Sequence, residues 1–510
     1  METEHSAGRR RALVAGSVGN FIEWFEFGVY GYFATIIAAN FFTPEGGSEA
    51  EGLIKTYASF AVAFFFRPLG AALFGRLGDR IGRRPTLIAV LLLMTGATTL
   101  IGVLPTRATA GAAAPWLLTL VRAVQGLSAG GEFGGAVSVM TEFAPPGRRG
   151  LYGAWQSFTV ALGLLAGAGL AALLGVLLSE EALYDWGWRL PFLLTLPLGL
   201  AALWLRLRLA ETPAFGRARA AAEGGGPAPG PPPGTAAPGT AGIPSPGTAA
   251  PGTTPPGTAA PGLAGITPPG ITPPGITPPG TTPPGVAPPG TAAPGTGSAG
   301  TGASGVPRRP GRRETARAIA LGSGRLMGWS AAGYTFLVVM PSYLQATLDV
   351  SFTRALAAAV LANLGFACSI LPAGALSDRI GRRPVMLAGA LLVVVSTFPL
   401  MNLLQDPDTP TAVQCAAVFV AGATVGLMAG PGPAMLAEMF PTAVRYTGLG
   451  LAYSLSNAVF SGCAGLIITE LIEHTHNADI PAYYTAVTCG VSVFALLTLR
   501  GDDHRRALRE

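Results

Sequence analysis

The sequence predicts an all-α membrane protein with twelve transmembrane helices in two six-helix bundles. Half of the 510 residues are hydrophobic and only 12% are charged. This composition cannot supply the charged shell of an ordinary soluble domain. The peptide GRLGDRIGRRP at 75–85 returns as GALSDRIGRRP at 374–384, and each copy lies between long apolar stretches. A repeat of this kind indicates a duplicated membrane protein.

Each spanning helix is expected where an apolar segment of about 20 residues could cross a hydrocarbon core of roughly 30 Å. Six such segments precede the centre of the chain and six follow it. In order they are 13–39, 53–75, 86–105, 114–140, 151–177, 189–207, 319–345, 355–376, 385–404, 412–437, 446–470 and 481–499. The predicted parts are therefore an N-terminus at 1–12, bundles at 13–208 and 319–499, a central loop at 209–318 and a C-terminus at 500–510.

The arginines predict the orientation in the bilayer, because positively charged residues collect in short loops that stay in the cytosol. Arginine-rich stretches lie at 9–11, 76–84, 148–149 and 500–509. The loops on the other side carry mainly Asp and Glu. We therefore expect a multi-pass protein of the cytoplasmic (inner) membrane with both termini in the cytosol. These loops also account for the net charge of +6 without a nucleic-acid-binding surface.

The central loop contains a Pro/Gly-rich insert at 224–307 that has no charged residue and repeats with a period near five. Proline and glycine recur too often for a helix, and a spanning backbone must satisfy its own hydrogen bonds. We expect a disordered cytosolic linker with polyproline character. The alternative is a ligand for Pro-binding modules of a cytosolic partner.

Nothing in the sequence indicates an enzyme, a cofactor or a metal site. The four cysteines, Cys368, Cys415, Cys463 and Cys489, lie in apolar segments without metal-ligand spacing, which predicts small buried hydrophobic residues. The four histidines occupy positions 5, 474, 476 and 504, in terminal or loop stretches. No Ser/His/Asp arrangement and no phosphate-binding loop is found.

Ionisable residues within a spanning helix are costly and are functional candidates by default. In the first helix, one face about 120° wide carries Asn20, Glu23, Glu26, Phe27 and Tyr30. Glu23 lies about 15 Å beyond the cytosolic start, near the bilayer midplane where carriers bind substrate. We expect Glu23 or Glu26 to exchange protons or contact substrate, and Asn20 to contact substrate. The alternative is that both only pair with arginines or backbone donors.

The fourth helix carries a second polar group. Gln125 and Glu132 lie about 20° apart on the helical wheel, and Arg122 lies within about 80° of both. These side chains can share one cavity wall. We expect Glu132 to take part in proton coupling and Gln125 in substrate binding, and Arg122 to bind substrate or form a charge pair inside the cavity.

Arg67 lies deep in the second helix. Two interpretations of this buried cation stay open. It could clamp a substrate carboxylate, or it could be the structural partner of Glu23 or Glu26.

The two repeated hairpins are predicted to form a gating latch. An aspartate can lie against the positive N-terminus of a neighbouring helix and pair with Arg. Membrane orientation alone would explain the arginines but not an Asp at the same position of both copies. The predicted latch residues are Gly75, Asp79, Arg80, Gly82, Arg83, Gly374, Asp378, Arg379, Gly381 and Arg382.

These motifs resemble those of the major facilitator superfamily, whose loop signature the two hairpin peptides match. Within this superfamily, five peptides resemble the metabolite:proton symporter branch. They are GNFIEWFEFGVYG at 19–31, RAVQG at 122–126, GGEFGG at 130–135, GWRLPF at 187–192 and ETPAF at 211–215. The peptides MPSYL at 340–344, MFPT at 439–442 and PAYY at 481–484 are most similar to proline/glycine betaine transporters.

The resemblance implies two bundles around a central cavity that opens alternately to each side, with a proton and a small solute moving inward together. A betaine would present a cation and a carboxylate. Trp24, Phe27 and Tyr30 could offer aromatic faces to the cation, and Arg67 or Arg122 could hold the carboxylate. The same aromatic residues are equally typical of a helix-packing core.

Three other functions are weighed against this one. The nearest is a proton symporter for citrate, 2-oxoglutarate or shikimate, which shares most of the framework. A receptor or scaffold that uses the Pro-rich insert without moving solute differs in class. A drug/proton antiporter is disfavoured by the sequences of the first and fourth helices.

Overall fold

The computed structural model describes residues 2–207 and 311–500, apart from short gaps at 82, 132, 134–136, 138–139, 142–143 and 146. Several predicted features lie outside the described residues. They are Gly82, Glu132, the insert at 224–307 and the side chains of Asp79, Arg80 and Arg83.

The first half of the chain folds into helices that match the predicted segments. They are α1 (Glu2–Tyr32), α2 (Ala34–Ile37), η1 (Ala38–Phe42), α3 (Glu49–Ile81), α4 (Arg83–Val103), α5 (Arg107–Ala110), α6 (Ala113–Ala129), α8 (Arg149–Leu177), α9 (Glu180–Ala182), η2 (Leu183–Gly187) and α10 (Arg189–Leu207), where η denotes a π-helix. The predicted first span thus runs from α1 through η1.

The second half also folds into helices that match the predicted segments. Its helices are α12 (Arg312–Tyr334), η3 (Thr335–Val339), α13 (Met340–Leu348), α14 (Phe352–Ile380), α15 (Arg382–Gln405), α16 (Thr411–Ala429), α17 (Gly432–Met439), α18 (Thr442–Ser456), η4 (Asn457–Gly462), α19 (Ala464–Thr475) and α20 (Ile480–Leu497). Two of its spans contain π-helical segments, η3 and η4, which become important at the cavity.

The all-α membrane fold predicted from the sequence is confirmed. The described residues contain no β-strand, and nine of their helical stretches are long and apolar enough to cross a membrane. The other three predicted spans coincide with α1, α6 and the run from α12 to α13. Large side chains such as Trp116, Val395 and Phe494 are more than 70% exposed, as expected for surfaces that face lipid.

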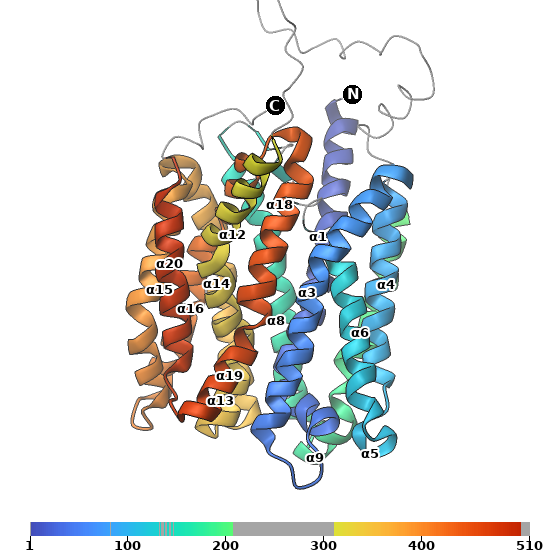
Figure 1. Ribbon diagram of the computed structural model, residues 1–510, viewed down its shortest axis with the longest axis vertical. Coiled ribbons are helices and arrows are strands. Elements are labelled where there is room, and N and C mark those ends of the chain that lie inside the picture. Colours follow the sequence, from blue (N-terminus) through green and yellow to red (C-terminus); the bar gives the residue numbers. More distant parts are fainter. Residues whose placement is uncertain are drawn as a thin grey trace, which may run out of the picture. The chain divides into compact units, whose positions relative to one another are not determined.

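The helices on either side of the insert pack into one compact unit. In Figure 1 the blue and cyan helices α3, α4 and α6 lie on the right, and the yellow to red helices α12, α15 and α20 lie on the left. Helix α8 of the first half runs along α14 of the second, and hydrogen bonds join the two. The halves therefore meet along helices that are far apart in sequence.

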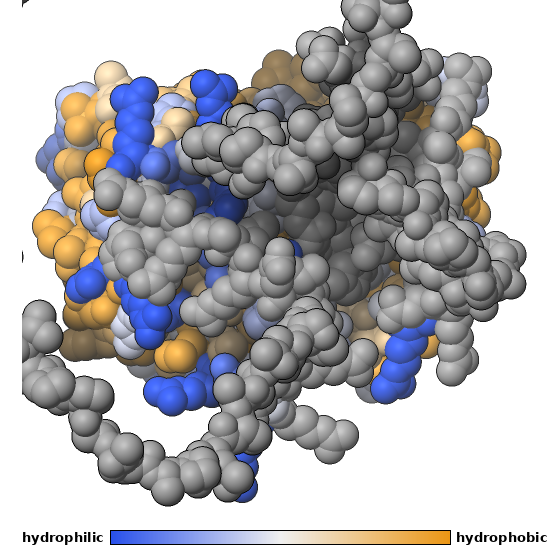
Figure 2. Space-filling model, turned by 90° about the horizontal axis from the view of Figure 1, so that it is seen from above, coloured by the Kyte–Doolittle hydropathy of each residue, from blue (hydrophilic) through white to orange (hydrophobic). Residues whose placement is uncertain are grey.

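We call the end at which α3 and α14 finish the motif face, because both repeated hairpins lie there. Helix α1 begins and α20 ends at this face, and α5, α9 and α13 lie at the other end, the opposite face (Figure 1). Figure 2 looks onto the motif face and shows hydrophilic side chains there, with hydrophobic side chains along the flanks.

Glycines allow two helix pairs to approach closely, one pair in each half. A Cβ added to Gly126 of α6 would collide with the carbonyl oxygen of Ala63 in α3. In the second half, a Cβ on Gly422 of α16 would collide with the carbonyl oxygen of Ala362 in α14. Small residues have this use in membrane helix packing. The internal duplication is therefore visible in the packing as well as in the hairpins.

We expect Gly126→Ala to lower the melting temperature of the purified protein, because α3 and α6 must separate to admit the methyl group. Gly96→Ala in α4 is the matched control, since nothing lies within 4 Å of its added Cβ. Alanine is favoured over glycine in a helix by about 1 kcal/mol, so the control should be neutral or stabilising. Thermal unfolding, monitored by size-exclusion chromatography, gives the melting temperatures of both variants. Equal melting temperatures would contradict the close approach.

Candidate functional site

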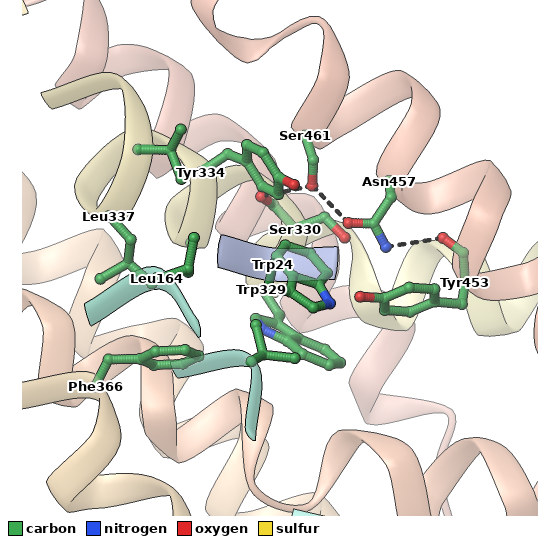
Figure 3. Close-up of a pocket in the computed structure, with 13 residues that line it drawn as sticks. Trp24, Leu164, Trp329, Ser330, Tyr334, Leu337, Phe366, Tyr453, Asn457 and Ser461 are labelled. Atoms are coloured by element: carbon green, nitrogen blue, oxygen red, sulfur yellow. Dashed lines mark hydrogen bonds between the residues drawn. The ribbon is translucent and has the colours of Figure 1, made fainter. Parts of the chain in front are cut away.

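A cavity with about 360 Å³ of empty space lies where the two halves meet (Figure 3). Trp24 from α1 and Leu164 from α8 line it on the side of the first half. The second half contributes residues from α12, η3, α14, α18 and η4, including Trp329, Tyr334 and Tyr453. The wall is therefore assembled from segments more than 400 positions apart in the chain.

The two π-helical segments shape the side of the cavity formed by the second half. Segment η3 follows directly after Tyr334, and η4 supplies Asn457 and Ser461. π-Helical turns are rare and often occur at functional sites. Ser461 donates a hydrogen bond to Asn457 Oδ1 (2.8 Å), and Asn457 Nδ2 donates to the carbonyl of Tyr453 (3.0 Å). These bonds hold the polar side chains of the wall in place, as Figure 3 shows.

A buried ion pair lies next to the cavity. Arg67 Nη2 lies 3.0 Å from Glu23 Oε1, and both side chains are at most 3% exposed. The guanidinium carbon of Arg67 is 5.5 Å from the ring centre of Trp24, a cavity residue, and 4.4 Å from that of Phe27. Burying two charges is costly unless they pair, so the ion pair and the aromatic faces together allow these groups to stay in the interior.

A chain of hydrogen bonds joins the other two predicted ionisable residues. Arg122 Nη1 donates to Gln125 Oε1 (2.8 Å), and Gln125 Nε2 donates to Thr98 Oγ1 (2.5 Å). Thr98 Oγ1 in turn donates to Glu26 Oε2 (2.6 Å). The chain crosses from α6 through α4 to α1. A change in the protonation of Glu26 can therefore reach Arg122 through neutral side chains.

The guanidinium of Arg122 is fully buried among aromatic rings. Its central carbon lies 4.1 Å from the ring centre of Tyr30, 4.8 Å from Phe60 and 5.0 Å from Phe27. Within the described residues, its Nε and Nη2 atoms have no hydrogen-bond acceptor. Such donors favour a second acceptor, and a carboxylate matches the guanidinium fork.

The structure distributes the predicted binding residues over different roles. Trp24 lines the cavity, whereas Phe27 and Tyr30 pack against the arginines. Asn20 donates to Thr159 Oγ1 (2.6 Å) and to the carbonyl of Gln156 (3.1 Å), which fixes α1 against α8. For Arg67, the contact with Glu23 corresponds to the structural interpretation left open by the sequence.

On the motif face, the second hairpin contacts the first half of the chain. Asp378 accepts hydrogen bonds from the backbone N–H groups of Gly150 (2.7 Å) and Leu151 (2.9 Å) at the N-terminus of α8. Arg382 Nη1 lies 2.7 Å from Asp378, and Arg382 Nη2 lies 2.9 Å from Glu438. An acid at a helix N-terminus is favoured by the helix dipole. Asp378 and Arg382 thus make the contacts expected of a latch, and the role of the latch as a gate stays a prediction.

Gly381 makes the turn of this hairpin possible. Its φ of +100° lies in a region that residues with a Cβ rarely adopt, and its N–H donates to the carbonyl of Ser377 (3.0 Å). The turn brings Arg382 back toward Asp378. The backbone conformation of this turn therefore explains why the motif has a glycine at this position.

Hydrogen bonds also join the halves between the cavity and the opposite face. The hydroxyls of Tyr57 and Ser342 lie 2.5 Å apart, and Tyr32 Oη donates to the carbonyl of Leu337 (3.1 Å). Together with Asp378, these contacts hold the halves together on both sides of the cavity. Opening the cavity to either face requires one set to break.

Sequence reasoning missed several residues of the site. Trp329, Tyr334, Tyr453, Asn457 and Ser461 are neutral, so the search for charges within spans did not select them. Thr98 and Glu438 were missed as well. A polar stripe on α18 and η4 was the one available signal, because Asn457 and Ser461 are four residues apart in an otherwise apolar segment.

The described residues offer no group of three or more His, Cys, Asp or Glu side chains that could hold a metal ion. All four cysteines are free thiols. Cys489 is buried as predicted, but the prediction is wrong for Cys368, which is exposed. An apolar segment can present a cysteine to lipid as readily as to the core.

Comparisons with family models agree with this architecture. Residues 12–225 match the model described as "Sugar (and other) transporter", and residues 326–510 match the model of the "Major Facilitator Superfamily". The two matches fall on the two halves of the chain.

Curated relatives match over nearly the whole length. The "Ectoine/proline transporter ProP" of Corynebacterium glutamicum is 32% identical, over 98% of this chain and 85% of the relative. The "Proline/betaine transporter" of Escherichia coli strain K12 is 29% identical, over 97% of this chain and 84% of the relative. Among solved structures, the proton:xylose symporter XylE superposes with a TM-score of 0.65 at 16% identity, covering 96% of this chain and 95% of that one. This last likeness concerns the fold.

Replacing Glu23 by Gln is expected to destabilise the protein by about 3–5 kcal/mol, because the buried cation of Arg67 loses its carboxylate. Glu51→Gln is the matched control, since Glu51 pairs with Lys55 on the surface, where both are about half exposed. Denaturant unfolding in detergent measures the difference. The double variant Glu23→Gln, Arg67→Gln should recover part of the loss. A Glu23 variant as stable as the Glu51 control would contradict the pairing.

We expect Asp378→Asn to open the motif face more often, because an amide binds the N–H groups of Gly150 and Leu151 less strongly than a carboxylate does. Thiol labelling of Ala154→Cys, a buried position beside Gly374, reports opening in a chain without native cysteines. Labelling should rise at least fivefold. Asp406→Asn, in the turn after α15, is the control and should leave the rate unchanged. An unchanged rate in Asp378→Asn would argue against a latch.

Proposed function

Since this chain belongs to the major facilitator superfamily, we propose that it is a proton-coupled symporter that imports a small zwitterion, such as proline or glycine betaine, by alternating access. The similarity to proline, betaine and ectoine transporters supports this substrate class. The cavity between the halves supports the mechanism. The bilayer is its environment, and its partners are the solute and protons.

One observation carries the proposal: buried carboxylates lie beside buried guanidiniums at the edge of the cavity. A proton on Glu23 removes the charge that holds Arg67. Arg67 can then attract the carboxylate of a solute that enters next to Trp24, and loss of the proton restores the pair and favours release. Glu26 offers a second proton site, connected to Arg122 through Thr98 and Gln125.

The orientation is part of the proposal. The motif face points to the cytosol, because Arg149, Arg379 and Arg382 lie there, together with the start of α1 and the end of α20. Inward transport then means uptake from the opposite face, which carries Glu180 and Asp185.

A di- or tricarboxylate symporter is the second candidate, and one observation favours it. Arg122 keeps two donor atoms without an acceptor in the described part of the chain. A second carboxylate could occupy them. Direct comparison of substrates decides between the candidates.

We expect membrane vesicles with an imposed inward proton gradient to accumulate labelled glycine betaine or proline more than citrate, 2-oxoglutarate or shikimate. Glu26→Gln should reduce this accumulation at least tenfold, because the carboxylate no longer releases a proton. Exchange of labelled for unlabelled solute without a gradient should persist. Glu51→Gln, on the surface, is the control.

Accumulation without a gradient, or no accumulation of any of these solutes by protein present in the membrane, would overturn the symporter. Preference for a dicarboxylate would select the second candidate. Immunoblots of the vesicles establish that equal amounts of each variant are compared.

The Pro/Gly-rich insert is a linker in this proposal, so transport does not depend on a cytosolic partner. Replacing 224–307 by a short Gly/Ser linker should leave gradient-driven uptake within about twofold of the parent, because such linkers behave as flexible chains. Loss of all uptake in a variant that still reaches the membrane would favour the receptor or scaffold instead.

A further inference from the structure

We infer that Trp24, Trp329, Tyr334 and Tyr453 form an aromatic box that selects solutes by the number of methyl groups on their ammonium nitrogen. The inference rests on the proposed function, since it assigns substrate preference to the same cavity. All four side chains line the cavity and are less than a tenth exposed. They come from α1, α12 and α18, so the box straddles both halves.

The rings are arranged in two pairs around one space. The ring centres of Trp24 and Tyr334 are 6.0 Å apart, and those of Trp329 and Tyr453 are also 6.0 Å apart. Figure 3 shows Trp24 in the centre of the view, with Trp329 below it and Tyr453 to its right. Phe133 stacks on one face of Tyr453, with centres 3.4 Å apart and planes within 5°. Only the other face of Tyr453 is therefore available to a ligand.

Two of the three aromatic faces predicted from the sequence, those of Phe27 and Tyr30, are already occupied by the protein's own cations. Arg122 lies over Tyr30, and both arginines lie over Phe27. A ligand ammonium at these rings would meet two guanidiniums and be repelled. The box lies at the cavity instead. Trp24 reaches it, because its ring centre is 5.5 Å from the guanidinium carbon of Arg67 and its side chain also lines the cavity.

The lining of the cavity favours an ammonium that has lost its N–H groups. None of the thirteen lining residues is charged. Asn457 Oδ1 already accepts a bond from Ser461, and the carbonyl of Tyr453 accepts one from Asn457. A primary ammonium would bring three donors into a wall that offers no carboxylate, and unmade hydrogen bonds are costly. A trimethylammonium has no such donors and is bound by ring faces.

The hydroxyl of Tyr334 supplies the contact for the other end of the solute. Tyr334 is 5% exposed, and its Oη has no hydrogen-bond partner within the described residues. A buried hydroxyl of this kind gains a bond when a carboxylate enters. The hydroxyl therefore gives the cavity a polar group for the carboxylate end of a betaine.

The test measures binding of glycine, N-methylglycine, N,N-dimethylglycine and trimethylglycine to the purified full-length protein by isothermal titration calorimetry. Affinity should rise along the series, by about tenfold or more from the first to the last. Trp329→Leu should lower the affinity for trimethylglycine about 5- to 30-fold and flatten the series. Tyr453→Leu should do the same and serves if Trp329→Leu is not monodisperse.

Tyr334→Phe tests the contact with the carboxylate end of the solute separately from the contact with its ammonium end. It keeps the ring and removes the hydroxyl, so it should weaken all four ligands by a similar factor and preserve the methyl dependence. Phe494→Leu, a lipid-facing aromatic residue 73% exposed, is the control and should change nothing.

Equal affinity for all four ligands, or an equal loss for all four in Trp329→Leu and Tyr453→Leu, would overturn the box. These outcomes are distinct from failure of the proposed function. A steep series in a protein without gradient-driven uptake would keep the box and reject the symporter. Gradient-driven uptake with equal affinity for all four ligands would keep the symporter and reject the box.

Discussion

The whole arrangement depends on keeping charged side chains inside a protein that lipid surrounds. An isolated carboxylate or guanidinium in the bilayer interior is costly, so each must find an opposite charge, a hydrogen bond or an aromatic face. Arg67 has Glu23 and the ring of Phe27, and Arg122 has Gln125 and the ring of Tyr30. These groups anchor α1 to α3, α4 and α6. The first half of the chain is therefore built around the chemistry that the proposed function uses.

The second half supplies mainly neutral groups to the cavity. Its aromatic side chains and the bonded pair Asn457 and Ser461 form a wall without charge. In the proposed function, the second half then supplies most of the rings that contact the solute, and the first half supplies the carboxylates that bind protons. The ring of Trp24 is the contact between them, because it faces both Arg67 and the empty space. Movement of one half against the other would change both environments together.

The two ends of the cavity are held by different kinds of bond. On the motif face a carboxylate, Asp378, binds the N-terminus of α8 and Arg382. Toward the opposite face neutral hydroxyls and carbonyls make the contacts, as in Tyr57 with Ser342. Charged hydrogen bonds are stronger than neutral ones. The close packing at Gly126 and Gly422 keeps each half rigid, so opening is expected where the halves meet rather than within them.

The sequence by itself determined the membrane class, the two sets of six spans, the paired hairpins and the family resemblance, because hydropathy, length and repeats are local properties. It also selected Glu23, Glu26, Arg67 and Arg122, since charges within apolar segments stand out. Which of them pair, and that Thr98 joins Glu26 to Gln125, was decided only by the tertiary structure. The aromatic wall was hidden for the same reason: Trp329 and Tyr453 look like ordinary core residues until the crossing of α1, α12 and α18 places them around one space.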